Sequence, residues 1–245
     1  MTKTNDRWPS FLVLGAISLG SIAPMARAQD DRMDRRIFSY VQGEQFEYRA
    51  ATQGRDTLSW DIRGWIGGDY HRLFFKTQGD APTQGAVDRG EMQLRYSRLI
   101  SPFWDLMLGA RYDVKPDPSR AYAVAALHGL SPYFYEVDAD LFVSEEGDVS
   151  ARLEVEYQLL LAQKLILTPS FELNFAVQEV KEVGVGPGLS DVELGLRLRY
   201  EIRREFAPYI GFVWERKVGR TAALARAAGE EFDTPAFVAG IRFWF

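Results

Sequence analysis

Apolar and polar residues alternate one by one along much of this chain. The clearest segment is residues 192–202, where apolar positions alternate with mostly charged ones. A helix would scatter these charges around its circumference, whereas a β-strand places alternate residues on opposite faces. Residues 104–114, 135–141 and 151–159 show the same alternation. These four segments are therefore predicted to be strands with one apolar and one polar face.

Weaker alternation and turn residues between these segments predict eight further strands. They lie near residues 39–49, 57–66, 70–78, 88–99, 120–130, 164–178, 206–217 and 235–245. The alternation is blurred in the first, third and sixth of the twelve. An alanine-rich stretch, residues 221–229, predicts one or two helical turns within the last long loop.

The connections between the predicted strands alternate in length. Short, turn-like connections follow the even-numbered strands, at residues 67–69, 100–102, 130–132, 162–164 and 203–205, and longer loops follow most odd-numbered ones. Outer-membrane barrels have short periplasmic turns and longer outer loops. The pattern predicts an all-β fold: a transmembrane, antiparallel up-and-down β-barrel of about 12 strands with both termini periplasmic.

Alternation alone leaves open a soluble barrel or sandwich whose apolar face points inward. Side chains fill a barrel of about eight strands, so twelve strands packed with apolar residues would leave a void, whereas a charged, water-bearing interior would not. Aromatic residues also lie beside the short turns, as in an interfacial girdle: Tyr70, Phe103, Trp104, Tyr133, Phe134, Tyr135, Phe206, Tyr209 and Phe245. Both observations favour an outer surface in contact with outer-membrane lipid.

The closing segment, residues 237–245, alternates as a strand does and ends on Phe245. Its apolar face is predicted to meet lipid, and Arg242 lies on the opposite face. This ending resembles the signal read by the barrel-insertion machinery of Gram-negative bacteria. The resemblance implies that machinery as a partner and the cell outer membrane as the location.

The amino-terminal segment has the features of a secretory signal peptide. Lys3 and Arg7 precede an apolar stretch, and Ala26-Arg27-Ala28 matches a cleavage site, so residues 1–28 are predicted to be removed. The alternative, a short membrane anchor, is disfavoured because the apolar stretch is below the ~18 residues of a spanning helix. A short acidic segment, residues 29–38, then precedes a single barrel domain, residues 39–245.

Composition restricts the possible functions. Removing residues 1–28 changes the net charge from −5 to −7, and an acidic chain argues against a nucleic-acid partner. No cysteine is present, so neither disulfides nor thiolate metal sites can form. Of the possible soft metal ligands, Met33 in the acidic segment and a lumen-facing Met107 suit monovalent copper, although a lone methionine more often fills space.

If the apolar face meets lipid, charged residues of both signs line the lumen. The predicted lumen charge network comprises Asp61, Arg63, Glu91, Arg95, Asp105, Arg111, Arg152, Glu154, Glu156, Glu172, Glu193, Arg197, Arg199 and Arg242. One interpretation is a set of ion pairs that braces the barrel and fills the bore. The other is a path for cations, with Glu136, Asp138 and Asp140 beside Glu154 and Glu156 as an acidic wall.

The chain has only two histidines, His71 and His128, which restricts catalysis. A Ser-His-Asp hydrolase would need one of them beside a serine, and no serine stands in a nucleophile motif. We therefore expect no enzymatic activity, with an outer-membrane hydrolase as a minor alternative.

Several runs resemble the copper resistance protein B family of outer-membrane proteins. The matching stretches include residues 96–105, 113–120, 130–137, 152–157, 188–209, 214–217 and 237–245. The resemblance implies an outer-membrane barrel that takes part in copper resistance and homeostasis, with copper ion as its ligand and periplasmic copper-resistance proteins as partners. Family members commonly carry a Met/His-rich segment ahead of the barrel, whereas residues 29–36 contain Met33 alone and no histidine.

The expected function is therefore binding of copper ions or aid to their passage across the outer membrane. The candidate metal residues are Met33, Met107, Glu136, Asp138 and Asp140. The alternative is a structural or general diffusion barrel without metal preference.

Overall fold

The computed structural model describes residues 37–83 and 85–245. The predicted signal peptide and Met33 lie outside the described residues. The strands are β1 Phe38–Ala51, β2 Thr57–Gly67, β3 His71–Pro82, β4 Arg89–Ser101, β5 Trp104–Lys115, β6 Arg120–Leu130, β7 Glu136–Ser144, β8 Val149–Glu156, β9 Leu159–Ala162, β10 Leu165–Ala176, β11 Gly188–Tyr200, β12 Phe206–Lys217 and β13 Asp233–Trp244. The described residues contain one α-helix, α2 Gly219–Ala228, where the alanine-rich stretch predicts helical turns, and two short 3-10 helices, η1 Pro132–Phe134 and η2 Lys181–Val183.

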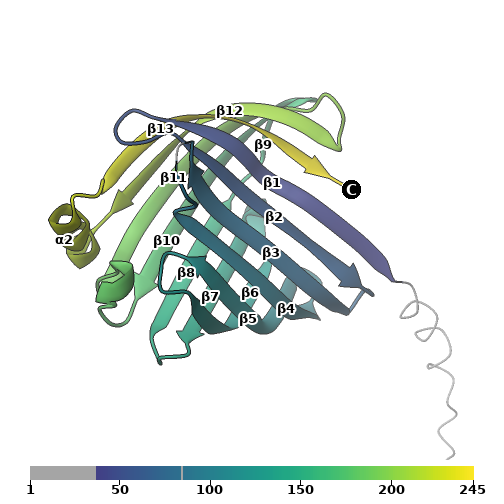
Figure 1. Cartoon of the computed structure of the whole chain (residues 1–245). Coiled ribbons are helices and arrows are strands. Elements are labelled where there is room, and N and C mark those ends of the chain that lie inside the picture. Colours follow the sequence, from purple (N-terminus) through teal and green to yellow (C-terminus); the bar gives the residue numbers. More distant parts are fainter. Residues whose placement is uncertain (1–36, 84) are drawn as a thin grey trace, which may run out of the picture.

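The strands form one closed antiparallel barrel (Figure 1). Each strand pairs with the next along the chain, and β1 pairs with both β2 and β13, which closes the ring. Both β8 and the short β9 pair with β10, so together they make one strand of the wall. The described residues therefore form a twelve-stranded barrel, which confirms the predicted fold class.

The polarity of the wall is opposite to that of a water-soluble protein. In β4, Glu91, Gln93 and Arg95 are at most 4% exposed, whereas Met92 and Leu94 are 60% and 54% exposed. Since alternate residues of a strand lie on opposite faces, polar side chains fill the interior and apolar ones cover the outside. Such an outer surface is stable only against lipid. No helix in the described part of the chain is long and apolar enough to cross a membrane.

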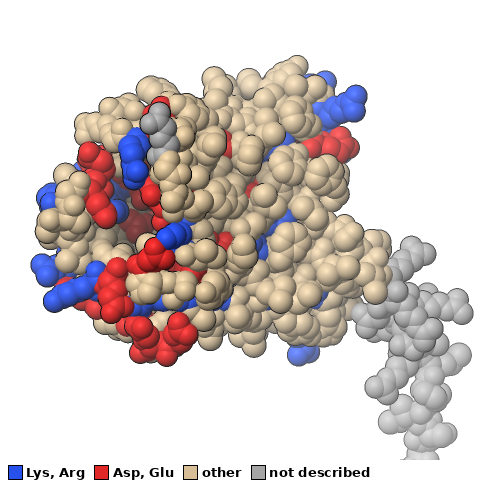
Figure 2. Space-filling model, in the orientation of Figure 1, with Lys and Arg blue, Asp and Glu red and all other residues tan. Residues whose placement is uncertain are grey.

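The outer surface carries an uncharged belt. In Figure 2, charged side chains gather at the end of the barrel that carries α2, while the middle of the visible face is almost free of charge. Of the predicted girdle residues, Phe103, Tyr133, Phe134 and Phe245 are more than 60% exposed. Tyr209 is an exception: it is 5% exposed and faces the bore, so its assignment to the girdle is wrong. The physical reason is the two-residue period, because Tyr209 lies three residues after the outward-facing Phe206.

The last long loop packs against the loop before β11. Arg220 in the first turn of α2 donates a hydrogen bond to Glu179 at 2.8 Å, and this bond lowers the pKa of Glu179 below its usual value. The N–H of Gly186 donates to the Thr221 hydroxyl at 2.9 Å, and Thr221 is buried. A Cβ at Gly186 would lie 2.4 Å from Arg220 Cβ, so the close approach requires glycine there.

Candidate functional site

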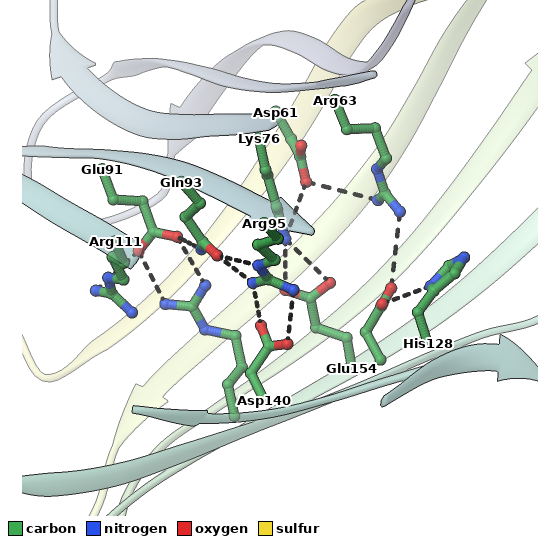
Figure 3. A network of polar contacts seen from close by, with 12 residues as sticks. Asp61, Arg63, Lys76, Glu91, Gln93, Arg95, Arg111, His128, Asp140 and Glu154 are labelled. Carbon is green, nitrogen blue, oxygen red and sulfur yellow. Dashed lines mark hydrogen bonds and ion pairs between the residues drawn. The ribbon is translucent and has the colours of Figure 1, made fainter. Parts of the chain in front are cut away.

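Ion pairs cross the bore between strands that are not neighbours in the wall (Figure 3). Arg95 on β4 donates two hydrogen bonds to Asp140 on β7, at 2.9 and 2.8 Å. Arg152 on β8 donates two to Glu91 on β4, both at 3.1 Å. Lys76 on β3 lies 3.2 Å from Glu154 on β8. These contacts tie β3 and β4 to β7 and β8 across the interior.

A second group of buried charges joins β1 to β11. Arg197 donates to both oxygens of Glu47 at 2.9 Å, and the Tyr209 hydroxyl donates to Glu47 at 2.9 Å. Arg49 lies 3.2 Å from Glu193. Glu47 and Arg49 are absent from the predicted network because register shifts near Gly43–Glu47 blur the alternation of β1. Charged residues within that blurred stretch are the signal that could have identified them.

The structure pairs nearly all of the predicted lumen charges. Thirteen of the fourteen have an oppositely charged group within 3.7 Å. Glu156 is the exception: in the described part of the chain it makes no ion pair, and its buried Oε1 has no hydrogen-bond partner. Interspersed opposite charges thus satisfy one another inside the barrel, as the bracing interpretation requires.

Met107 lies in an apolar cluster within the bore. It is 3% exposed and packs with Val124, Ala126 and Phe142, against which Phe74 and Tyr122 also pack. The cluster fills the part of the interior beside β5 and β6. A flexible thioether suits such irregular packing, so the surroundings of Met107 are those of a space-filling methionine.

The three predicted acidic ligands of β7 have different partners. Glu136 accepts a hydrogen bond from Gln158 at 3.2 Å, and Asp140 is held by Arg95. Asp138 lies 2.5 Å from the Nδ1 atom of His128 and 3.7 Å from Arg63. Among residues 37–83 and 85–245, no three histidine or carboxylate side chains are grouped as a closed metal site. Met107 thus packs in the apolar cluster, while the three carboxylates of β7 each have a different polar partner.

A polar cavity occupies the centre of the bore. It measures about 800 Å³ including its solvent-open parts. Its charged lining consists of three arginines and eight carboxylates: Arg49, Arg63, Arg89, Asp61, Asp80, Glu136, Asp138, Glu154, Glu156, Glu172 and Glu193. Carboxylates are in excess, so the cavity attracts cations more than anions.

The two histidines lie on opposite faces of the wall. His128 faces the bore and contacts Asp138, whereas the Nδ1 atom of His71 lies 2.5 Å from the hydroxyl of the outward-facing Tyr96. Among the described residues, no serine hydrogen-bonds to either histidine. The lumenal Asp–His pair was missed by sequence reasoning, which weighed His128 only as a catalytic base.

The closed sheet, apolar belt and charged bore together define an outer-membrane β-barrel. Two solved barrels share this fold. The NanC porin aligns with a TM-score of 0.53 at 12% identity, covering 84% of this chain and 99% of the porin. Outer membrane phospholipase A from Escherichia coli aligns with a TM-score of 0.52 at 13% identity, covering 82% and 92%. At these identities the similarity concerns the fold alone.

Sequence comparison identifies the family. Residues 37–245 match the family model described as copper resistance protein B precursor. Copper resistance protein B from Escherichia coli is 42% identical over 212 residues, which cover 86% of this chain and 71% of that protein. A copper resistance protein B homolog from Pseudomonas syringae pv. tomato is 41% identical over the same coverage. The chain belongs to the copper resistance protein B family, which supports a role in copper resistance at the outer membrane of a Gram-negative bacterium.

Proposed function

We propose that copper ions enter the bore and contact its carboxylate-rich inner face during passage across the outer membrane. The observation that carries this proposal is the central cavity, whose lining has eight carboxylates against three arginines. Fixed negative charge beside a water-filled space concentrates cations there. Family membership points to copper as the cation.

Contact with copper in this mechanism is transient. Conduction needs binding that is favourable enough for an ion to enter and weak enough for it to leave. Most cavity carboxylates are already paired with arginine or lysine, so each offers an ion only part of its coordinating capacity. Periplasmic copper-resistance proteins are the proposed partners that exchange the ion with the barrel at its inner end.

The decisive experiment neutralises carboxylates that make no ion pair within the described residues. The double variant Glu136→Gln, Glu156→Gln replaces two carboxyl groups of the cavity without breaking an ion pair of the described residues. The matched control is Glu231→Gln in the exposed loop before β13. In a deletion strain, the wild type and the control should restore copper tolerance and cell-associated copper, and the double variant should restore less. Unchanged copper tolerance and copper content upon deletion would refute the copper role.

The cross-bore ion pairs favour a second candidate, a structural or general diffusion barrel. Pairs such as Arg95–Asp140 and Glu91–Arg152 occupy space that a wide channel would leave to water. Planar-bilayer conductance that does not respond to copper, together with no metal bound to purified protein, would favour this candidate.

A further inference from the structure

We propose that His128 is a copper-contacting residue of the bore and that Asp138 positions its ring. This inference rests on the proposed function and adds a nitrogen ligand for the copper ion in the bore. The Nδ1 atom of His128 lies 2.5 Å from Asp138 Oδ1. A histidine that ligates a metal commonly donates its other ring N–H to a carboxylate, which orients the ring and fixes its tautomer. The contact between His128 Nδ1 and Asp138 Oδ1 matches this arrangement.

The wall of the barrel holds this pair in place. On β6, His128 stands opposite Asp105 of β5 and Asp138 of β7, so it lies in a row of side chains that face the bore. Asp138 also lies 3.7 Å from Arg63 on β2, across the interior. With Asp138 held from both sides, the imidazole can turn little without losing its hydrogen bond.

In the neutral ring, the second nitrogen of His128 has no hydrogen-bond partner among the described residues and can accept a metal. When Nδ1 donates to Asp138, the lone pair of the imidazole is on Nε2. In Figure 3 a dashed line meets one side of the labelled His128 ring, and no hydrogen bond to Nε2 occurs among residues 37–83 and 85–245. The His128 side chain is 33% exposed, so solutes in the bore can reach it.

An imidazole ligand makes the bore more suitable for copper than carboxylate ligands alone would. Imidazole is a preferred ligand of copper, whereas carboxylates suit harder cations such as magnesium and calcium. Asp138 lines the acidic cavity and contacts His128, so the imidazole lies directly behind one carboxylate of the cavity lining. A single imidazole, with water completing the coordination, binds an ion reversibly, as passage requires.

His71 provides a matched control within the same chain. It stands on the outer face, where its ring stacks on Tyr96 with 5.8 Å between centroids. Since the chain contains only these two histidines, His71→Asn leaves His128 as the sole imidazole. The converse variant, His128→Asn, leaves only the outer histidine.

The test uses the mature protein, folded in detergent without a histidine tag, and one equivalent of Cu²⁺. Electron spin echo envelope modulation detects the remote nitrogen of a copper-bound imidazole. We expect this signal in the His71→Asn protein and its loss in the double variant His71→Asn, His128→Asn. In the His71→Asn background, Asp138→Asn should weaken Cu²⁺ affinity about tenfold, because an outer-shell partner typically contributes 10- to 100-fold.

The outcomes separate this inference from the proposed function. If the His71→Asn protein binds Cu²⁺ without an imidazole signal, the assignment of His128 is wrong while copper binding by the barrel stands. If no variant binds Cu²⁺ and deletion leaves copper tolerance unchanged, the proposed function fails as well. In cells, His128→Asn should lower copper tolerance relative to His71→Asn, and equal tolerance of the two would overturn the inference.

Discussion

The ion pair between Arg95 and Asp140 is predicted to brace the barrel across its interior. Both side chains are 3% exposed, and two hydrogen bonds of 2.8 and 2.9 Å join them. Because β4 and β7 are separated by two strands in the wall, no backbone hydrogen bond duplicates this link. The perturbation is a double-mutant cycle with Asp140→Leu, Arg95→Leu and the combined variant.

The expected loss in the free energy of unfolding follows from the burial of both charged groups. Removing one partner of a buried pair leaves an uncompensated charge and costs about 3–5 kcal/mol. Arg95 keeps a hydrogen bond to Gln93 Oε1 at 2.6 Å, so Asp140→Leu is expected near the lower end of that range. Replacing both partners by apolar residues removes both charges, and the combined variant should lie within about 2 kcal/mol of the wild type. The two single substitutions should therefore be strongly non-additive.

The assay is reversible urea unfolding in lipid vesicles, followed by tryptophan fluorescence. A surface pair serves as the control: Arg55 and Asp88 are 2.9 Å apart, but their side chains are 67% and 50% exposed. Its cycle should give a coupling energy of about 0–1 kcal/mol. If the Arg95–Asp140 cycle gives a similarly small coupling energy, water in the bore screens the pair and the bracing argument is wrong.

Three further predictions test the outer face, the apolar cluster and the loops. Leu94→Arg places a charge on the lipid-facing surface and should lower the free energy of unfolding by up to ~2–4 kcal/mol, measured in vesicles; no loss would contradict the assignment of that face. Met107→Leu conserves volume and should cost less than ~1.5 kcal/mol without changing copper tolerance; a loss of tolerance at unchanged stability would instead mark Met107 as a ligand. Thr221→Val removes the acceptor of the Gly186 N–H and should speed limited proteolysis of residues 177–187 while leaving the urea midpoint of the barrel unchanged. Equal cleavage rates would show that this hydrogen bond does not hold the loop.

The sequence determined the strands and their faces. A strand turns alternate side chains to opposite sides whatever it packs against, so the period of two in residues 192–202 could be read directly. The twelve strands and the charged bore followed from the same local rule. The same rule accounts for Tyr209: its position beside a turn suggests the girdle, but the alternation along β12 turns its side chain into the bore.

Only the tertiary structure decided which lumenal groups meet. Arg95, Glu91 and Lys76 each have a partner on a strand three to five places away in the wall, and these contacts depend on closure and register of the whole barrel. The packing of Met107 among apolar side chains depends on closure in the same way. The His128–Asp138 pair required the register between β6 and β7. Alternation along a strand determines whether a side chain points into the bore or towards lipid. The closed sheet determines which other side chains it contacts.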